Sequence, residues 1–339
     1  MERRQIGKTE LSVTVLGFGG APLGNLYAPV GDAEAQASLE AAWAAGRRLF
    51  DTAPFYGYGL SERRVGDALR EHPRDQFVLS TKVGRLIRRG WHESKAQEMF
   101  RSPMPFHARF DYSYDGVMRS LEDSYQRLGL DRIDIALIHD IGSTTHGDNH
   151  AAMMKAAMEG GYRALDELRR NGQLLAIGLG INETPVCLEA MQHGDFDCVL
   201  LAGRYTLLEQ AALDDLLPAC ATRNVSVIIG GPFNSGILAR ADAADATYNY
   251  EIAPPEIRGK VRQLVAICQA HRVSLPAAAL QFTLAHPVVA GVIPGARTVA
   301  EVTSHHDMLT AAIPAGFWAD LRTSGLLHAA APVPVALPG

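Results

Sequence analysis

The sequence predicts an α/β fold of one type: a single (β/α)8 TIM barrel that begins with a β-hairpin and carries long loops at its C-terminal face. Two features of the 339-residue chain support this prediction. Short apolar runs alternate with amphipathic segments of helical period, and eight such runs can be traced along the chain. Strands buried on both faces of a parallel sheet read as such runs, and eight strand–helix units close into a barrel. A doubly wound open sheet is the alternative that the same alternation allows.

The composition favours a large globular unit without nucleic-acid or membrane partners. Hydrophobic residues make up 47% of the chain, charged residues make up 20%, and the formal net charge is −5. No basic run is dense enough for nucleic acid, and no apolar stretch is long enough to span a membrane. Residues 1–13 lack the apolar core of a signal peptide, so a cytoplasmic protein is expected. The four cysteines lie far apart, which indicates reduced thiols, and no cluster has the spacing of a zinc site.

The first half of the chain is expected to begin with a hairpin at 3–15. The predicted strands are 15–19, 48–51, 77–82 and 133–139, and the predicted helices are 32–45, 61–70 and 113–128. Asp32 is the expected N-cap of the first helix, because a short polar side chain accepts hydrogen bonds from free N–H groups there. Residues 83–112 and 140–160 are expected to be loops. The densest basic cluster, formed by Arg85, Arg88 and Arg89, is expected to be solvated.

The second half of the chain continues the alternation of predicted helices and strands. The predicted helices are 162–171, 184–193, 213–223, 256–271 and 275–286, and the predicted strands are 174–179, 197–201, 225–229 and 288–293. Residues 230–255 are expected to form another loop. Two helices, one from 298 and one at 317–327, are expected to complete the fold. Residues 1–330 are therefore predicted to form one barrel domain, and the Pro-rich segment 331–339 a loosely ordered tail.

Polar side chains stand at or just beyond the ends of three consecutive predicted strands. Asp51 ends the second strand, Lys82 the third and His139 the fourth, and Tyr56 follows Asp51 by five residues. Barrel enzymes place their sites where the carboxyl ends of the strands meet, so these four residues are expected at the mouth of the barrel. Each residue alone has a structural explanation, such as an ion pair at the rim or a packed aromatic ring.

As a set, these segments resemble those of the aldo-keto reductases. The segments that carry the resemblance are Asp51-Thr52-Ala53-Pro54-Phe55-Tyr56-Gly57, Ser80-Thr81-Lys82 and Leu137-Ile138-His139, with further similarity at 59–69, 127–131 and 293–295. The resemblance extends over nearly the whole chain. It implies hydride transfer between a nicotinamide and a carbonyl carbon, with Tyr56 as acid in reduction and base in oxidation. In this scheme Lys82 lowers the pKa of Tyr56, Asp51 holds Lys82, and His139 orients the substrate oxygen.

The resemblance also implies cofactor contacts, of which this sequence keeps only a part. The family carries a Ser-Asn pair after the fifth strand and a Gln on the sixth, where this chain has Gly180-Ile181 and Ala202. Tyr205 is expected beneath the nicotinamide, and the Gly-rich loop at 230–238 around the pyrophosphate. A partial GxGxxG at 17–22 is expected to be a turn at the mouth. The residues expected to bind the cofactor are Gly19, Asn182, Tyr205, Gly231, Pro232, Phe233, Asn234, Ser235, Gly236, Leu238, Pro294, Gly295, Arg297 and Glu301.

The segment after the last strand favours NAD over NADP. Family members that prefer NADP carry Lys and Arg near the positions that Gly295 and Glu301 occupy here. A carboxylate at that place repels the 2′-phosphate of NADP, although Arg297 retains one positive charge. NAD is therefore the expected cofactor and NADP the alternative. Glu301 also suits the first turn of a helix in its own right.

Residues 200–208 and 231–236 resemble the branch of D-threo-aldose (L-fucose) 1-dehydrogenases and pyridoxal 4-dehydrogenase. This implies oxidation of a cyclic hemiacetal to a lactone, on an aldose of the L-fucose, D-arabinose or galactose type, or on pyridoxal. Trp91 and Asp140 are the expected substrate contacts. The alternatives are a general NADPH-dependent aldehyde reductase and a non-enzymatic binding subunit like the β subunit of potassium channels. A monomer or a weak homo-oligomer is expected.

Overall fold

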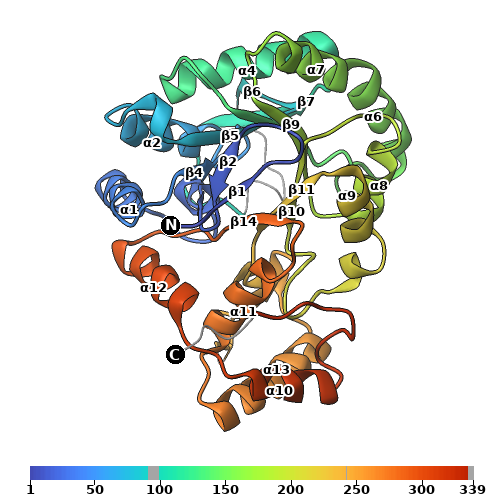
Figure 1. Ribbon diagram of the computed structural model, residues 1–339. Coiled ribbons are helices and arrows are strands. Elements are labelled where there is room, and N and C mark those ends of the chain that lie inside the picture. The colour runs from blue at the N-terminus through green and yellow to red at the C-terminus, as the bar shows by residue number, and fades with distance from the viewer. Residues whose placement is uncertain (91–98, 242, 335–339) are drawn as a thin grey trace.

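The computed structural model describes residues 1–90, 99–241 and 243–334, and a parallel barrel forms its centre (Figure 1). The eight strands of the sheet are neighbours in the order β14-β11-β10-β9-β8-β5-β4-β3. Their bounds are β3 Phe18–Gly19, β4 Leu49–Asp51, β5 Val78–Val83, β8 Ile135–His139, β9 Ala176–Ile181, β10 Cys198–Ala202, β11 Ser226–Gly230 and β14 Val289–Ile293. The strands are almost entirely buried, which explains their continuous apolar runs and confirms the predicted barrel.

Pairing between the two ends of the chain closes the barrel. Parallel bridges join Leu16 to Val292 and Gly19 to Gly295, beside the first and last strands. The Gly17 N–H donates to the Val292 carbonyl at 2.9 Å. A closed ring of strands has no exposed edge, so the alternative of an open doubly wound sheet is wrong.

Helices surround the strands on the outside of the barrel, as Figure 1 shows. They are α1 Asp32–Ala44, α2 Leu60–Leu69, α4 Tyr114–Leu128, α7 Arg163–Arg170, α8 Thr184–Ala190, α9 Leu216–Arg223, α10 Pro255–His271, α11 Leu275–Leu284, α12 Val299–Thr310 and α13 Ala315–Thr323. The Ser113 side chain caps α4 by accepting from the Gly116 N–H. The predicted N-cap of α1 is wrong, because the helix begins at Asp32 and Gly31 precedes it.

The predicted hairpin is confirmed and covers the N-terminal end of the barrel, in front of the strands in Figure 1. It pairs β1 (Arg3–Gln5) with β2 (Ser12–Thr14) in antiparallel register. Ile6 and Val13 are fully buried and pack against apolar side chains from the strands, including Leu49 and Ile135. The hairpin therefore seals the end of the barrel opposite the mouth.

Three segments expected to be loops contain secondary structure. Residues 83–112 include the antiparallel pair β6 (Arg85–Arg89) and β7 (Phe106–Phe110). Residues 140–160 are mostly helical, and residues 230–255 contain the antiparallel pair β12–β13. The remaining short elements are α5 Ser143–His146, α6 His150–Ala156, the π-helix η4 Ala157–Tyr162, β12 Thr247–Tyr248, β13 Glu251–Ile252, and the 3-10 turns η1 Ala21–Gly24, η2 Arg74–Gln76, η3 Gly147–Asn149, η5 Ala211–Leu213 and η6 Asn234–Gly236.

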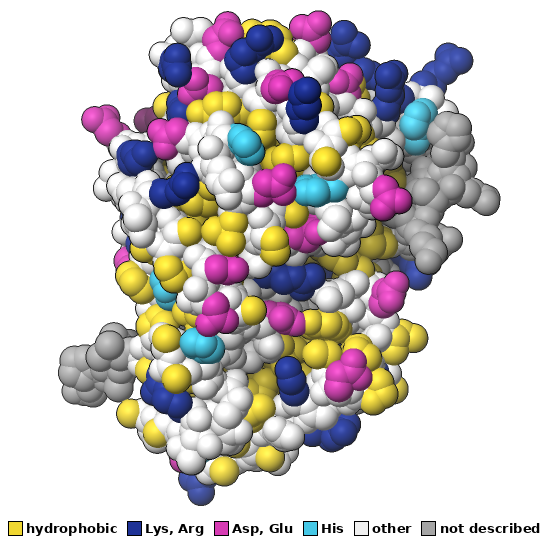
Figure 2. All heavy atoms as spheres, turned by 90° about the vertical axis from the view of Figure 1, so that its right-hand side faces the viewer, with side chains coloured by type: hydrophobic (Ala, Val, Ile, Leu, Met, Phe, Trp, Pro, Cys, Tyr) yellow, Lys and Arg dark blue, Asp and Glu magenta, His cyan; other side chains and the backbone are white. Residues whose placement is uncertain are grey.

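The segment after residue 330 starts in contact with the body of the protein. Ala331 is buried, and its carbonyl accepts a hydrogen bond from Arg322 of α13 at 2.9 Å. The division at residue 330 stays a prediction. None of the helices described here is long and apolar enough to cross a membrane. Acidic, basic and hydrophobic side chains are interspersed over the face shown in Figure 2.

Candidate active site

The centre of the candidate site is a buried ion pair between the ends of two neighbouring strands. Asp51 ends β4, Lys82 lies near the end of β5, and each side chain is 2% exposed. Lys82 Nζ donates to Asp51 Oδ2 at 2.7 Å and to the Thr52 carbonyl at 2.9 Å, and Ser80 Oγ donates to Asp51 Oδ1 at 2.7 Å. Burial alone would lower the pKa of Lys82, but Asp51 and Tyr56 outweigh it and raise that pKa. Lys82 is therefore held charged in one position.

A glycine gives the Lys82 side chain its space. Gly180 on β9 lies beside it, and a Cβ at this position would stand 3.2 Å from Lys82 Cε. Any larger residue would press on the stem that carries the ammonium group. A Cβ at residue 180 would therefore require the Lys82 stem to shift by a few tenths of an ångström.

Tyr56 lies directly over this pair, in the turn that follows β4. Lys82 Nζ is 4.7 Å from the centroid of the Tyr56 ring, and the His139 ring meets it edge-on with centroids 6.1 Å apart. Burial raises the pKa of Tyr56 by more than Lys82 lowers it. In the free protein Tyr56 is therefore a protonated phenol. Lys82 does lower the pKa of Tyr56, as expected from the sequence, but burial outweighs this effect and the net pKa is raised. The structure thus brings together all four of the residues predicted to be catalytic.

His139 and Asp140 end β8 side by side. His139 Nε2 lies 3.3 Å from Asp140 Oδ2, while its Nδ1 has no hydrogen-bond partner among the described residues. Burial, Arg85 and Lys82 lower the pKa of His139 well below its usual value, so the ring is neutral. Asp140 has a φ of +44°, and Tyr112 Oη donates to the His139 carbonyl at 2.7 Å. Aspartate tolerates this backbone region better than most residues, and the Tyr112 hydroxyl, which also donates to the Asp140 carbonyl at 3.1 Å, fixes the backbone there.

Arg85 was missed in the sequence, where it was expected to be a solvated loop residue. It is 6% exposed, and Arg85 Nη2 lies 2.5 Å from Asp140 Oδ2. Its guanidinium carbon lies 4.0 Å from the ring centroid of Phe55 and 5.1 Å from that of Phe110. β6 runs from buried at Arg85 and Leu86 to exposed at Arg89, and its sequence, RLIRR, does not show which arginine is buried.

The residues expected at the nicotinamide differ in how far they are open to a ligand. Asn182 follows β9, and its backbone carbonyl accepts from Arg204 Nε at 2.8 Å. Tyr205 is completely buried, with its ring 5.1 Å from that of Phe282 and 5.7 Å from that of His286, centroid to centroid. This packing does not favour a stacking role for Tyr205, which stays a prediction. Arg204, its half-buried neighbour, is the larger side chain beside Asn182.

The loop expected to hold the pyrophosphate contains several residues with left-handed backbone. Gly231 has a φ of +57° and Gly236 one of +104°, and no heavy atom lies within 4 Å of a Cβ built at Gly236. Asn234 is buried and ties the loop to Thr206 and Gly203 through its amide. Pro232 and Leu238 are also buried, and the ring of Phe233 lies 5.7 Å from that of His305. The open glycines leave bare backbone where an anionic ligand could approach.

Arg297 and Glu301 lie at the first turn of α12, beside the seam of the barrel. The Glu301 N–H donates to the Thr298 side chain at 3.2 Å, and the Glu301 carboxylate accepts from the Arg297 N–H at 2.6 Å. This reciprocal cap explains the acid at 301 without a ligand. Arg297 Nε is buried without a partner in the described part of the chain. A helix N-terminus, an incompletely bonded arginine and open glycines on the facing loop fit an anionic dinucleotide.

Two tyrosines extend the site outwards. The rings of Tyr27 and Tyr250 lie 6.5 Å apart, and Tyr250 is close enough to Tyr56 and Asp140 for their charges to interact. The Tyr250 N–H donates to Ser235 Oγ at 3.1 Å, which joins the β12–β13 hairpin to the predicted cofactor loop. Tyr27 was not singled out from the sequence. Trp91, one of the predicted substrate contacts, lies outside the described residues.

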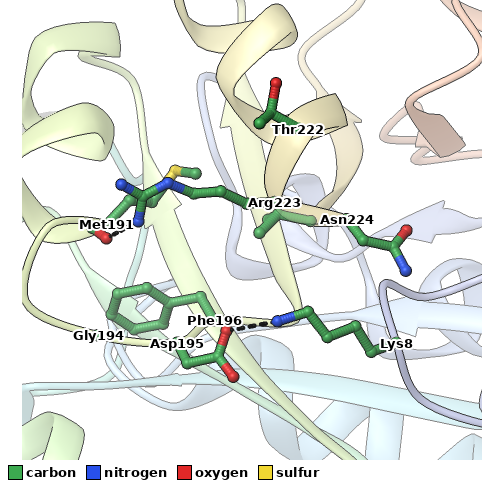
Figure 3. Close-up of a pocket in the computed structure, with 9 residues that line it drawn as sticks. Lys8, Met191, Gly194, Asp195, Phe196, Thr222, Arg223 and Asn224 are labelled. Carbon is green, nitrogen blue, oxygen red and sulfur yellow. Dashed lines mark hydrogen bonds and ion pairs between the residues drawn. The ribbon is translucent and has the colours of Figure 1, made fainter.

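A hollow of about 310 Å³ lies at the end of the barrel opposite the candidate site. Figure 3 shows Lys8 and Arg223 beside it, each already paired: Lys8 Nζ with Asp195 Oδ1 at 2.8 Å and Arg223 with the Met191 carbonyl. With both cations occupied, this hollow offers little to a charged ligand. Within the described ranges, no three His, Cys, Asp or Glu side chains are grouped to hold a metal ion.

Comparisons with known proteins agree with this geometry. The model of the aldo/keto reductase family matches residues 15–324. The chain is 44% identical to pyridoxal 4-dehydrogenase of Microbacterium luteolum over 96% of its own length and 98% of the relative's, and 39% identical to D-threo-aldose 1-dehydrogenase of a Pseudomonas species over 94% and 95%. The solved structure of an aldo-keto reductase of Bacillus halodurans in its holo form superposes with a TM-score of 0.75 at 25% identity, covering 97% of both chains. The family match, the two dehydrogenase relatives and the strand-end site together show that the chain is an oxidoreductase of the aldo/keto reductase family.

Proposed function

We propose that this protein is an NAD-dependent dehydrogenase that oxidises the hemiacetal carbon of a cyclic sugar or of pyridoxal to a lactone. The observation that carries the proposal is the phenol of Tyr56 lying above the buried Asp51–Lys82 pair and edge-on to the neutral ring of His139. A proton donor–acceptor, a fixed cation and a neutral hydrogen-bonding ring are the groups that an alcohol–carbonyl interconversion needs.

A bound nicotinamide would supply the acceptor for the hydride, and the protein's own residues would bind and move the proton. In the oxidation, the O–H bond of the hemiacetal breaks and its proton passes to the Tyr56 oxygen as the C=O bond forms. His139, being neutral, can donate a hydrogen bond to that oxygen without exchanging charge. Lys82 stabilises the Tyr56 phenolate that accepts the proton, and Asp51 keeps Lys82 in place.

Both dehydrogenase relatives support a hemiacetal substrate. One relative carries the name D-threo-aldose 1-dehydrogenase and the other pyridoxal 4-dehydrogenase. We expect L-fucose, D-arabinose and sugars of the galactose type as the first class of substrate. The higher identity to the pyridoxal enzyme favours pyridoxal as a second candidate. Asp140, partly exposed at the mouth, would accept a hydrogen bond from a second hydroxyl group of either substrate.

The preference for NAD rests on the negative charge at the first turn of α12. The Glu301 side chain is 44% exposed and its carboxylate lies 3.8 Å from the Arg297 guanidinium, so it offsets the cation that would hold a 2′-phosphate. At an effective dielectric of 20, two unit charges about 6 Å apart repel by about 3 kcal/mol, and solvent reduces this further. We therefore expect NAD to be preferred by about 10- to 100-fold in kcat/KM, at ~1.4 kcal/mol per decade.

A substrate panel tests the proposal. L-Fucose, D-arabinose, D-galactose, L-galactose and pyridoxal are each offered with NAD, and NADH formation is followed. At least one of them should be oxidised with a high kcat/KM, and Tyr56→Phe protein serves as the matched inactive control. Turnover confined to the reduction of simple aldehydes by NADPH would overturn the proposal in favour of a general reductase. No turnover in either direction would point to a binding subunit.

A further inference from the structure

Arg85 joins the catalytic histidine to a carboxylate at the mouth of the barrel. Asp140 Oδ2 is shared, at 2.5 Å from Arg85 Nη2 and 3.3 Å from His139 Nε2. The rings of Phe55 and Phe110 contact the guanidinium, as described above, so Arg85 is held in one orientation. The three charged or polar groups thus form a chain from Arg85 through Asp140 to His139.

The contact with Asp140 determines which ring nitrogen of His139 carries the proton. A neutral imidazole has one N–H and one bare nitrogen. A bare Nε2 would place its lone pair against the Asp140 carboxylate, so Nε2 carries the hydrogen. Nδ1 is then bare, and no described residue hydrogen-bonds to it and competes for the tautomer.

This tautomer requires Asp140 to be ionised. Burial raises the pKa of Asp140, and Arg85 is the largest influence in the opposite direction. A protonated Asp140 could donate to Nε2 and leave the His139 proton on Nδ1. The other titratable groups that face Asp140 or His139 from neighbouring elements are Lys82, Tyr56, Tyr112, His146, Glu183 and Tyr250.

We propose that Arg85 is a positioning residue, which keeps Asp140 a carboxylate and thereby holds the His139 proton on Nε2, ready for the reacting oxygen. At 3.3 Å the Asp140 carboxylate attracts the Nε2–H by its charge without forming a short hydrogen bond, so a substrate oxygen can accept that proton. The inference deepens the proposed function, since it takes His139 as the group that contacts the reacting oxygen.

The first test reads the tautomer in the free protein and needs no substrate. Protein labelled with 15N in histidine is compared with a His139→Asn variant, which identifies the His139 signals. The parent and the Arg85→Lys variant should show the Nε2–H form throughout. The Arg85→Met variant should change to the Nδ1–H form as the pH falls through the range in which Asp140 binds its proton. A parent with Nδ1–H, or an Arg85→Met variant that keeps the parental tautomer at every pH, would overturn the proposal.

The second test uses the pH dependence of kcat/KM with whichever substrate the panel identifies. Arg85→Met should acquire a new acidic limb, on which kcat/KM falls by about tenfold per pH unit. The limb should be absent in Arg85→Met/Asp140→Asn, where residue 140 cannot titrate. A uniform loss with the parental profile would mean that Arg85 has only a structural role.

The double variant also guards against misfolding. Arg85→Met alone leaves the partly buried Asp140 carboxylate unpaired, whereas Arg85→Met/Asp140→Asn removes both charges. If the single variant does not fold, Arg85→Met/Asp140→Leu replaces it, because leucine has no oxygen that could accept from Nε2–H as an asparagine amide could. That variant should lose the pure Nε2–H tautomer, and full retention of Nε2–H would refute the proposal. A failure of the substrate panel leaves the NMR result intact, so the two proposals fail separately.

Discussion

Replacing Lys82 with methionine should shift the oxidation reaction to higher pH, because it removes the cation beside the Tyr56 phenolate. The Lys82 ammonium lies 4.7 Å from the Tyr56 ring centroid, and at an effective dielectric of 20 a unit charge at that distance is worth about 3.5 kcal/mol. This corresponds to a rise of between about two and three units in the pKa of Tyr56.

The sign follows from the direction of the reaction. Oxidation needs Tyr56 as the base, so kcat/KM rises with pH through the pKa of Tyr56, which burial has already raised in the parent. The variant moves this rise further into the alkaline range. At a fixed pH below both values, kcat/KM should therefore fall by ~10²- to 10³-fold. Reduction, which needs the phenol, should lose less at neutral pH.

A second variant separates this chemical effect from damage to the fold. Lys82→Met leaves Asp51 buried and unpaired, which destabilises the protein by about 3–5 kcal/mol. Asp51→Asn/Lys82→Met removes both charges and should recover most of the lost Tm while oxidation stays slow. The assay is the pH profile of kcat/KM for both variants, with Tm measured alongside. A well-folded double variant with the parental pH profile would refute the role given to Lys82.

Three further changes test other parts of the site and the fold. Tyr56→Phe keeps the ring but removes the proton, so kcat should fall by ~10²–10⁴ at unchanged Tm, and near-parental turnover would contradict this. Glu301→Gln keeps the cap but removes the charge, so the ratio of kcat/KM with NAD to that with NADP should fall by about tenfold, and an unchanged ratio would place recognition elsewhere. Lysine at Gly295 is a poorer test, because a Cβ there would stand 2.6 Å from Pro22 Cγ. Burial lowers the pKa of His305 to about 3, so the unfolded state binds its proton first and stability is lost as the pH falls below about 6.5. His305→Leu should flatten the fall of Tm between neutral and mildly acidic pH, and parallel curves would argue against this origin.

The barrel could be predicted because its strands and helices have different apolar periods. Strands such as Ile135–His139 are buried throughout and read as unbroken apolar runs, whereas helices such as Tyr114–Leu128 bury one face. The mouth segments could not be predicted in this way. The pair β6–β7 is stabilised by Phe55 and Tyr58, which contact Phe100 and lie far from the pair in sequence, so its local pattern carries little information.

In the candidate site too, some residues could be placed from the sequence and others could not. Asp51, Lys82 and His139 are strand-end residues, and the geometry of a parallel barrel brings strand ends together whatever the loops do. The catalytic roles of these residues stay predictions. Their proximity could be predicted from the strand order alone, without knowledge of the loops. Arg85 lies within an Arg-rich segment, and nothing in its neighbours' identities distinguishes a buried arginine from solvated ones. Its burial depends on Phe110 and Asp140, whose positions only the folded chain defines.

The seam between the first and last strands lies beside the predicted cofactor site, and we expect it to form late in folding. The bridge from Gly19 to Gly295 joins segments separated by nearly the whole chain, and Pro294 to Glu301 lie directly beside it. Contacts of such long separation require the largest loop to close and tend to form slowly. A nascent or truncated chain that has not reached residue 295 cannot complete this joint. We therefore expect the protein to bind a dinucleotide only when the barrel is closed. Because the ligand binds the closed state, it should also stabilise the pairing between the first and last strands.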